Sequence, residues 1–184
     1  MATRTNSTGE HPVPRLRHVQ VAPDAYRAML ALEDYVRGSG LEAPLLELVR
    51  LRASYLNGCA YCVDMHTKDA RAAGEAEQRL YAVPVWRETG FYTPRERAAL
   101  AWTEAVTRLG PEGVPDEVYD AARSEFEEDE LVRLTMAVVA INGWNRLSIA
   151  FRPEVGAYRP RARAARPTAS TGEGAERHAG QDPG

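Results

Sequence analysis

Gly58-Cys59-Ala60-Tyr61-Cys62-Val63-Asp64-Met65-His66 is the stretch of sequence that decides both the fold and the chemistry of this chain. It holds the only two cysteines of the protein, and a histidine follows four residues after the second. On a helix, residues three, four and seven positions apart lie on one face. The spacing therefore predicts that Cys59, Cys62 and His66 lie within reach of one another.

The residues around this stretch carry helical signals throughout. Thr93-Pro94-Arg95-Glu96 is a capping box with proline at the first helical position, and Gly38-Ser39-Gly40 ends an earlier helix. No segment shows a competing strand pattern, so we predict an all-α fold. The expected helices cover residues 23–37, 44–57, 59–74, 94–109, 115–126 and 129–151, with one or two short turns within 75–81.

The last of these helices is apolar on most of its circumference, which is typical of a helix that is central or is covered by a neighbouring subunit. It also carries an echo: Glu47-Leu48-Val49-Arg50-Leu51 recurs as Glu130-Leu131-Val132-Arg133-Leu134. Asn57-Gly58 after the first copy is echoed by Asn142-Gly143 after the second, two residues out of register. The echo marks either an internal duplication of a helical hairpin or a coincidence in a chain rich in Leu and Arg.

Length and composition set the class of protein. A chain of 184 residues with a net charge of −3 is long enough for one domain and gives no electrostatic argument for nucleic acid or a membrane surface. We expect a flexible arm over 1–20, a folded domain over 21–152 and a disordered tail over 153–184, because both ends lack apolar periodicity.

No apolar run is long enough to span a membrane, and residues 1–14 lack the apolar core of a secretory signal. We therefore expect a cytoplasmic protein, in which thiols are reduced at rest. In that compartment a cysteine pair indicates catalysis, redox sensing or metal binding rather than a structural bridge.

A cysteine pair at the start of a helix suits reversible sulfur chemistry. The exposed N–H groups and the helix dipole favour the thiolate, most strongly at Cys59, which is nearer the helix start. His66 can take or return a proton near neutral pH. Glu47, on the preceding helix, can reach the site only if the two helices pack antiparallel.

The pattern of Glu47, eleven residues, Cys59-x-x-Cys62, three residues and His66 resembles the core motif of the alkyl hydroperoxidase D (AhpD)-like proteins, within the carboxymuconolactone decarboxylase family. The resemblance covers about residues 21–152 and includes Asn142-Gly143-Trp144-Asn145-Arg146. It implies an all-α fold, a homo-oligomer (trimer or hexamer), and a thiol-dependent peroxidase acting on hydrogen peroxide and organic hydroperoxides without a cofactor or metal.

The resemblance also implies roles for the residues. Cys62 attacks the peroxide, Cys59 resolves the sulfenic acid as a disulfide, and His66 with Glu47 forms a proton relay. A dithiol reductant, protein or lipoyl-type, then restores both thiols. The chain departs from the best-known members at Tyr61, where they carry a second histidine. Tyr61 and Asn145 are candidate supporting residues.

Other functions fit the same residues. The pair could serve a non-enzymatic redox sensor, or the chain could act on a small cyclic acid, as the decarboxylases of the family do. A structural disulfide across so short a loop removes little chain entropy. Zinc could bind Cys59, Cys62, His66 and Glu47, although three ligands on one helical face do not easily surround a tetrahedral ion.

Overall fold

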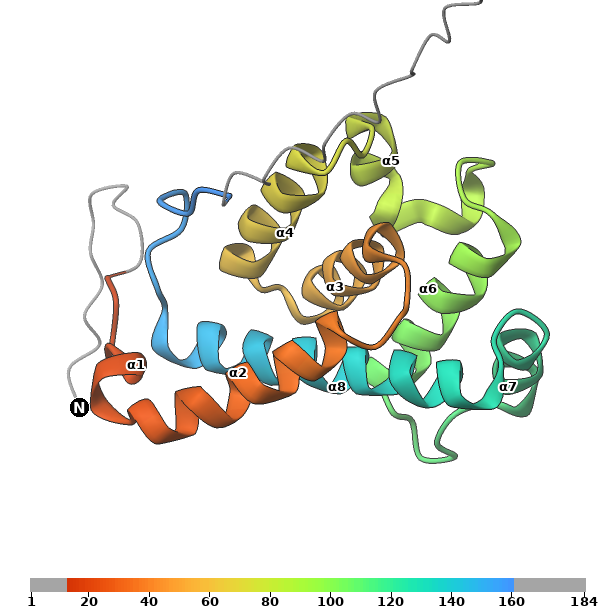
Figure 1. Ribbon diagram of the computed structural model, residues 1–184. Helices are drawn as coiled ribbons and strands as arrows, with labels where there is room; N and C mark the ends of the chain where they lie inside the picture. Colours follow the sequence, from red (N-terminus) through yellow and green to blue (C-terminus); the bar gives the residue numbers. More distant parts are fainter. Residues whose placement is uncertain (1–12, 161–184) are drawn as a thin grey trace, which may run out of the picture.

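The computed structural model describes residues 13–160, and within this range the regular structure consists of helices, as predicted. Figure 1 shows the helices in sequence order. They are α1 (His18–Val21), α2 (Pro23–Arg37), α3 (Ala43–Asn57), α4 (Ala60–Ala72), α5 (Glu77–Ala82), the 3₁₀ helix η1 (Val83–Glu88), α6 (Pro94–Thr107), α7 (Asp116–Arg123) and α8 (Glu128–Phe151).

The boundaries follow the sequence signals closely. The capping box forms as predicted, with the Glu96 N–H donating to Thr93 Oγ1 at 3.2 Å and the Thr93 N–H donating to Glu96 Oε2 at 2.8 Å. The main difference is at α7, which ends at Arg123 instead of about residue 126. Phe126 is only 2% exposed, and the chain turns after α7 so that this ring enters the core.

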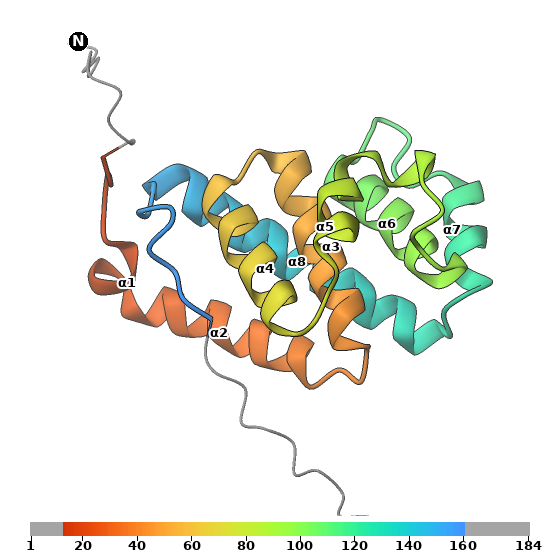
Figure 2. The same cartoon turned by 90° about the horizontal axis from the view of Figure 1, so that it is seen from above.

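Helix α3 lies at the centre of the molecule. It packs against α4, α6 and α8, while α2 runs alongside α8 (Figures 1 and 2). Leu48, Val49 and Leu51 of α3 have no exposed surface and belong to two different core clusters. A third, smaller cluster contains Cys59 and Cys62 and lies where the α3–α4 hairpin meets α8. Burial of α3 on several sides therefore fixes the position of the cysteine pair.

Helix α8 packs against α2, α3 and α6, yet not all of its apolar residues are covered. Val132 is 61% exposed and Val139 is 47% exposed. The echoed segment does not extend to a repeated hairpin. Asn57-Gly58 ends α3, whereas Asn142-Gly143 lies inside α8, which continues unbroken to Phe151.

The described parts of both chain ends pack onto the helical domain. Helix α1 lies in the segment expected to be a flexible arm, and the His18 ring stacks on Phe151 with ring centroids 5.2 Å apart. Residues 153–160 lie against α4, where the Tyr158 hydroxyl donates to Asp69 Oδ1 at 2.9 Å. These positions differ from the expected arm and tail, whose other residues, 1–12 and 161–184, are outside the described part. None of the described helices combines the length and apolarity required to cross a membrane.

Candidate active site: a cysteine pair beside a buried histidine and its glutamate partner

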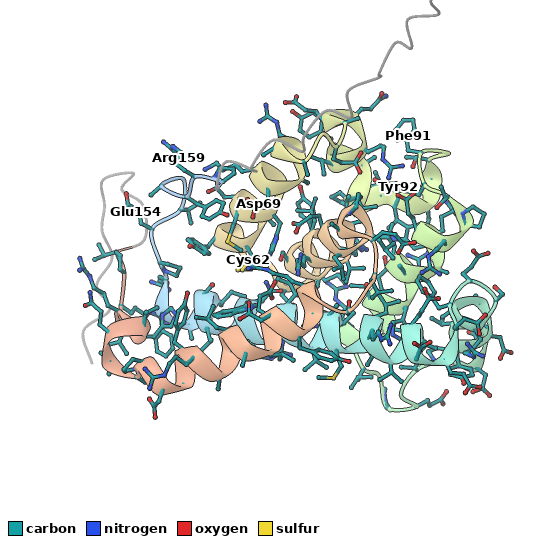
Figure 3. The ribbon with its side chains drawn as sticks, viewed as in Figure 1. Cys62, Asp69, Phe91, Tyr92, Glu154 and Arg159 are labelled. Atoms are coloured by element: carbon teal, nitrogen blue, oxygen red, sulfur yellow. The ribbon has the colours of Figure 1, made fainter. Side chains whose placement is uncertain are left out.

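The turn between α3 and α4 places both cysteines. Gly58 ends α3 with φ of 68°, a left-handed conformation that glycine adopts without a side-chain clash. Cys59 then caps α4, and its Sγ accepts a hydrogen bond from the Cys62 N–H at 3.4 Å. Both cysteines are free thiols and each is 1% exposed. Figure 3 shows Cys62 on α4 close to α8, with Asp69 further along the same helix.

The structure brings Glu47 and His66 together. Helices α3 and α4 run antiparallel, so Glu47, near the start of α3, accepts a hydrogen bond at Oε2 from His66 Nδ1 at 2.9 Å. Burial raises the pKa of Glu47, but the hydrogen bond and charge of His66, together with Arg50, outweigh burial and hold this pKa below its usual value. An ionised carboxylate only accepts hydrogen bonds, so the shared hydrogen is assigned to Nδ1.

The other ring nitrogen of His66, Nε2, makes no hydrogen bond within the described part of the chain. Nε2 is also buried. His66 follows Cys62 by one helical turn, but no hydrogen bond joins Nε2 to either sulfur in this structure. A buried polar atom without a partner is costly to maintain, and a catalytic role is one explanation for such an atom. Of the contacts that the predicted relay requires, the structure contains the one between Glu47 and His66 and does not contain one between His66 and a sulfur.

The two thiols differ in acidity. Hydrogen bonds from the Cys62 side chain outweigh burial and, with those from the Cys62 N–H, Ser148 and Asn145, lower the pKa of Cys59 to about 7. The pKa of Cys62 is raised far above its usual range by its hydrogen bond to Cys59, by burial and by the Cys59 charge. Because the pKa of Cys59 is about 7, the pair carries one negative charge, on Cys59, once the pH rises above that value. This agrees with the helix-start argument and differs from the role that the family resemblance gives to Cys62.

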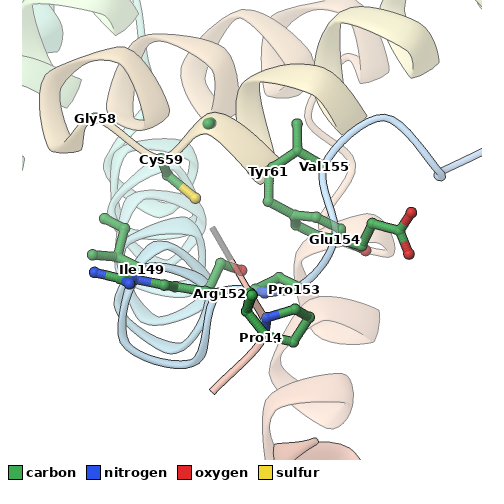
Figure 4. A pocket seen from close by; sticks show the side chains of 12 residues that line it. Pro14, Gly58, Cys59, Tyr61, Ile149, Arg152, Pro153, Glu154 and Val155 are labelled. Carbon is green, nitrogen blue, oxygen red and sulfur yellow. The ribbon is translucent and has the colours of Figure 1, made fainter. Parts of the chain in front are cut away.

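Cys59 also faces a cavity. Figure 4 shows the Cys59 sulfur directed into this cavity. The cavity has a volume of about 740 Å³. Tyr61 lines the same cavity. The pKa of its phenol is raised mainly by burial and, to a smaller extent, by the charge of Cys62 when that thiol is ionised. Cys62 is not among the lining residues. The walls come largely from the two described chain ends and the end of α8: Val13, Pro14, Ser148, Ile149, Arg152, Pro153, Glu154 and Val155.

Asn145 lies beside the sulfurs, on α8. It is fully buried, donates from Nδ2 to Ser54 Oγ at 3.1 Å and accepts from Asn57 Nδ2 at 2.8 Å. Its hydrogen bonding lowers the pKa of both thiols. Ser148, one turn later on α8, does the same and was not predicted from the sequence. The three-residue spacing from Asn145 was the signal that could have found it.

Two further buried charges, Arg50 and Glu33, lie near Glu47 and were not predicted as site residues. Arg50 donates from Nη1 to Glu47 Oε1 at 2.6 Å and from Nη2 to Glu33 Oε1 at 2.7 Å. Trp144 Nε1 donates to Glu33 Oε2 at 3.2 Å. Each of these two charged residues lies on an otherwise apolar helix face, and that pattern in the sequence could have identified them. Arg50 lies within the stripe of Leu residues on α3.

The described residues give the zinc alternative no support. No group of three or more His, Cys, Asp or Glu side chains among residues 13–160 is arranged to hold a metal ion. His66 Nδ1 already pairs with Glu47, and Cys59 and Cys62 pair with each other. These contacts favour proton and thiol chemistry at this site.

Comparison with known proteins gives the family and the fold of the chain. The family model of the carboxymuconolactone decarboxylase family matches residues 23–105, which include Glu47, both cysteines and His66. The chain is 42% identical over 136 residues to the uncharacterised protein YdfG of Bacillus subtilis (strain 168), covering 74% of this chain and 92% of that one. The chain therefore belongs to the carboxymuconolactone decarboxylase family, and within it to the AhpD-like proteins.

Solved structures show the same fold. ATU0492 of Agrobacterium tumefaciens, a protein of unknown function for which an AhpD antioxidant defence role has been suggested, is 44% identical with a TM-score of 0.76, covering 78% of this chain and 98% of that one. The debrominase Bmp8 shares the fold at 21% identity and a TM-score of 0.68, covering 76% and 75% of the two chains. Proteins with this fold thus include enzymes.

Proposed function

We propose that the protein is a thiol-dependent peroxidase that cycles between a dithiol and a Cys59–Cys62 disulfide. The observation that carries this proposal is the pair itself. Cys59 faces a cavity, and the pKa of its thiol is lowered to about 7. The thiol of Cys62 donates a hydrogen bond to the Cys59 sulfur. A thiolate reached from a cavity is the form of cysteine that attacks peroxides.

In the first step, the Cys59 thiolate attacks one peroxide oxygen. An S–O bond forms, the O–O bond breaks, and the departing oxygen takes a proton and leaves as an alcohol or as water. Cys59 is oxidised to a sulfenic acid. The family resemblance gives this step to Cys62, but the low pKa of Cys59 and its place on the cavity wall support the exchange of the two roles.

In the second step, Cys62 closes the disulfide. Its raised pKa means that it needs a base, and His66 Nε2, one turn away with no other partner among the described residues, suits that role. The Cys62 sulfur attacks the sulfenic sulfur, an S–S bond forms, and the hydroxyl leaves as water with a proton. A dithiol reductant, protein or lipoyl-type, then reduces the bridge through the cavity.

The test measures peroxide consumption with a dithiol reductant supplied in excess. Wild type is expected to turn over continuously, while Cys59→Ser and Cys62→Ser are expected to lose turnover. Trapping with a sulfenic-acid reagent separates the two roles. Cys62→Ser is expected to accumulate the trapped adduct on Cys59, whereas Cys59→Ser is expected to react slowly. Equal, slow peroxide consumption by wild type and both variants would refute the peroxidase.

Two alternatives give different results in the same assay. A non-enzymatic sensor would consume one equivalent of peroxide and then stop, even with reductant present. An enzyme acting on a small cyclic acid, as in the decarboxylases of this family, would keep its activity after loss of both cysteines. The lowered pKa of Cys59 favours the peroxidase over the second alternative, because that chemistry has no use for a thiolate.

We propose that the protein assembles as a homo-oligomer, a trimer or hexamer. Val132 and Val139 support this proposal, because they expose apolar surface at seven-residue spacing on α8, one face of that helix. Light scattering after size exclusion is expected to give the mass of three or six chains. Val139→Asp is expected to shift the protein to smaller species.

A further inference from the structure

The relay is held by a buried ion pair whose role the peroxidase mechanism leaves open. Glu33 is 7% exposed and Arg50 is 6% exposed. Burying two charges carries a large desolvation cost, and apolar residues of similar volume usually stabilise a fold at least as well. The pair is therefore poorly explained by stability alone, and its contacts indicate another role.

Arg50 fixes the orientation of the Glu47 carboxylate. Its guanidinium divides between two acids, with Nη1 2.6 Å from Glu47 Oε1 and Nη2 2.7 Å from Glu33 Oε1. The other Glu47 oxygen, Oε2, lies 2.9 Å from His66 Nδ1. Each oxygen of Glu47 thus has its own partner, so the carboxylate cannot rotate without breaking a charged hydrogen bond.

Glu33 in turn is tied to the sulfur side of the molecule. Its Oε2 accepts from Trp144 Nε1 at 3.2 Å, and Trp144 packs on the small cluster that contains both cysteines. The chain of contacts runs from α8 through α2 and α3 to His66 on α4. It therefore begins and ends at the proposed reaction site.

We propose that Arg50, anchored by Glu33, is a positioning residue for the proposed peroxidase, on whose mechanism this inference rests. By fixing Glu47, it keeps the hydrogen of His66 on Nδ1 and leaves Nε2 to accept the Cys62 proton. The Glu47 carboxylate lies 2.9 Å from His66 Nδ1. Its negative charge, held in that position, stabilises the imidazolium that forms when His66 takes up the proton.

Other charged and titratable groups near Glu47 and His66 affect how the rate of disulfide closure depends on pH, and a pH profile must take them into account. Arg37 Nε lies 3.3 Å from Glu33 Oε1 at the exposed rim. The groups that face the relay from the packed elements are Glu33 and Arg37 of α2, Glu47 and Arg50 of α3, Cys59, Cys62, His66 and Asp69 of the α4 region, and Tyr158 of the C-terminal segment.

The chain offers a matched control on the same helix. Arg52 lies two positions after Arg50, and its Nη2 is 2.6 Å from Glu104 Oε1. The two arginine side chains are similarly covered, at 8% exposure for Arg50 and 12% for Arg52. Arg52 does not contact Glu47 or His66, so a loss of positioning is expected only at Arg50.

The experiment compares Arg50→Gln, Arg50→Lys and Arg52→Gln in the full chain. ¹⁵N NMR of the histidine ring reports the His66 tautomer, and a thiol oxidant such as diamide drives disulfide closure for stopped-flow measurement across pH. Arg50→Gln is expected to mix the two tautomers and slow closure about 10- to 100-fold. Arg50→Lys is expected to recover part of the rate by restoring charge without the fork. Arg52→Gln is expected to keep both properties.

An unchanged tautomer and closure rate in Arg50→Gln, or equal losses in Arg50→Gln and Arg52→Gln, would overturn the proposal. If Arg50→Gln does not fold, Glu33→Gln replaces it, because this near-isosteric change loosens Arg50 and is expected to shift the tautomer in the same direction. Neither readout uses peroxide. A protein that fails to turn over peroxide but shows the expected tautomer change would refute the proposed function and leave the positioning role supported.

Discussion

Two half-buried glutamates of this molecule, Glu47 and Glu104, have similar environments and different consequences. Glu47 accepts from Arg50 and His66, and Glu104 accepts from Trp86 Nε1 at 2.7 Å, from Arg52 and from Arg87. In both cases burial raises the carboxyl pKa and the hydrogen-bond partners outweigh it, so both acids remain charged.

The difference lies in what the partners can do. The donors around Glu104 are two guanidiniums and an indole, none of which releases a proton near neutral pH. Glu47 shares a hydrogen with an imidazole whose other nitrogen is unpaired within the described chain. A lowered carboxyl pKa therefore marks an ion pair in both places, and only the titratable partner makes one of them a candidate for proton transfer.

The largest expected contrast is kinetic. Glu47→Gln removes the charged partner of His66 Nδ1 and is expected to slow disulfide closure about 100-fold, within the range seen for general acid–base residues. Glu104→Gln is expected to leave the rate within about twofold, because Glu104 does not contact His66 or the sulfurs. Stopped-flow tryptophan fluorescence with a thiol oxidant measures both. Equal losses in the two variants would erase the proposed difference between the glutamates.

The next contrast is in stability. Glu104→Gln leaves Trp86 Nε1 and two arginines competing for one amide oxygen, and we expect it to lower the free energy of unfolding by about 1–3 kcal/mol. Urea denaturation followed by circular dichroism provides the value. An unchanged midpoint would mean that the Glu104 cluster is not the structural element described above.

A smaller effect is expected in the pH dependence of stability. The pKa of Cys59 falls from an ordinary value of 9.0 to about 7 on folding, so the unfolded chain binds more protons between these values. Stability should therefore rise by up to about 2 kcal/mol from pH about 7 to about 9, and this gain is lost as pH falls through about 7.

Above pH about 9 we expect stability to fall as the pH rises, because the raised pKa of Cys62 keeps that thiol protonated only in the folded state. Urea titrations at several pH values, with Cys59→Ser as the control, test the whole profile. In the control the rise between pH about 7 and 9 should disappear. A rise that persists without Cys59 would assign the effect to another group.

The smallest effect concerns the C-terminal segment. Tyr158→Phe removes the hydrogen bonds to Asp69, which lie at 2.9 and 3.0 Å, and is expected to cost about 0.5–1.5 kcal/mol of stability. Because that hydrogen bonding lowers the pKa of Asp69 against the effect of burial, its loss should raise this pKa further. Carboxyl NMR titration follows Asp69. An Asp69 titration curve that does not move would contradict the contact.

Features that depend on residues close together in the sequence could be predicted, whereas features that depend on packing between helices could not. Pro94, Gly58 and the Thr93 capping box act through neighbouring backbone, so the helix ends could be predicted locally. Cys59, Cys62 and His66 lie on one helix, and their proximity follows from its period. The contact of Glu47 with His66 depends on antiparallel packing of two helices, which spacing alone does not fix.

Residues that come together from distant parts of the chain were not predictable. Glu33 contacts Arg50 only because α2 packs beside α3. Ser148 reaches the sulfurs because α8 packs against the hairpin formed by α3 and α4. The cavity wall is the clearest case. Val13 and Val155 lie in segments that looked featureless, and packing against the helical domain gives them a place at the site.

The central claim is that the two sulfurs form a disulfide with each other when the protein meets peroxide. The most direct measurement is intact mass and peptide mapping before and after one equivalent of peroxide. We predict loss of the mass of two hydrogens, a bridge within the peptide that contains Cys59 and Cys62, and full reversal by a dithiol. An unchanged mass, or a gain of oxygen without a bridge between these two residues, would contradict it.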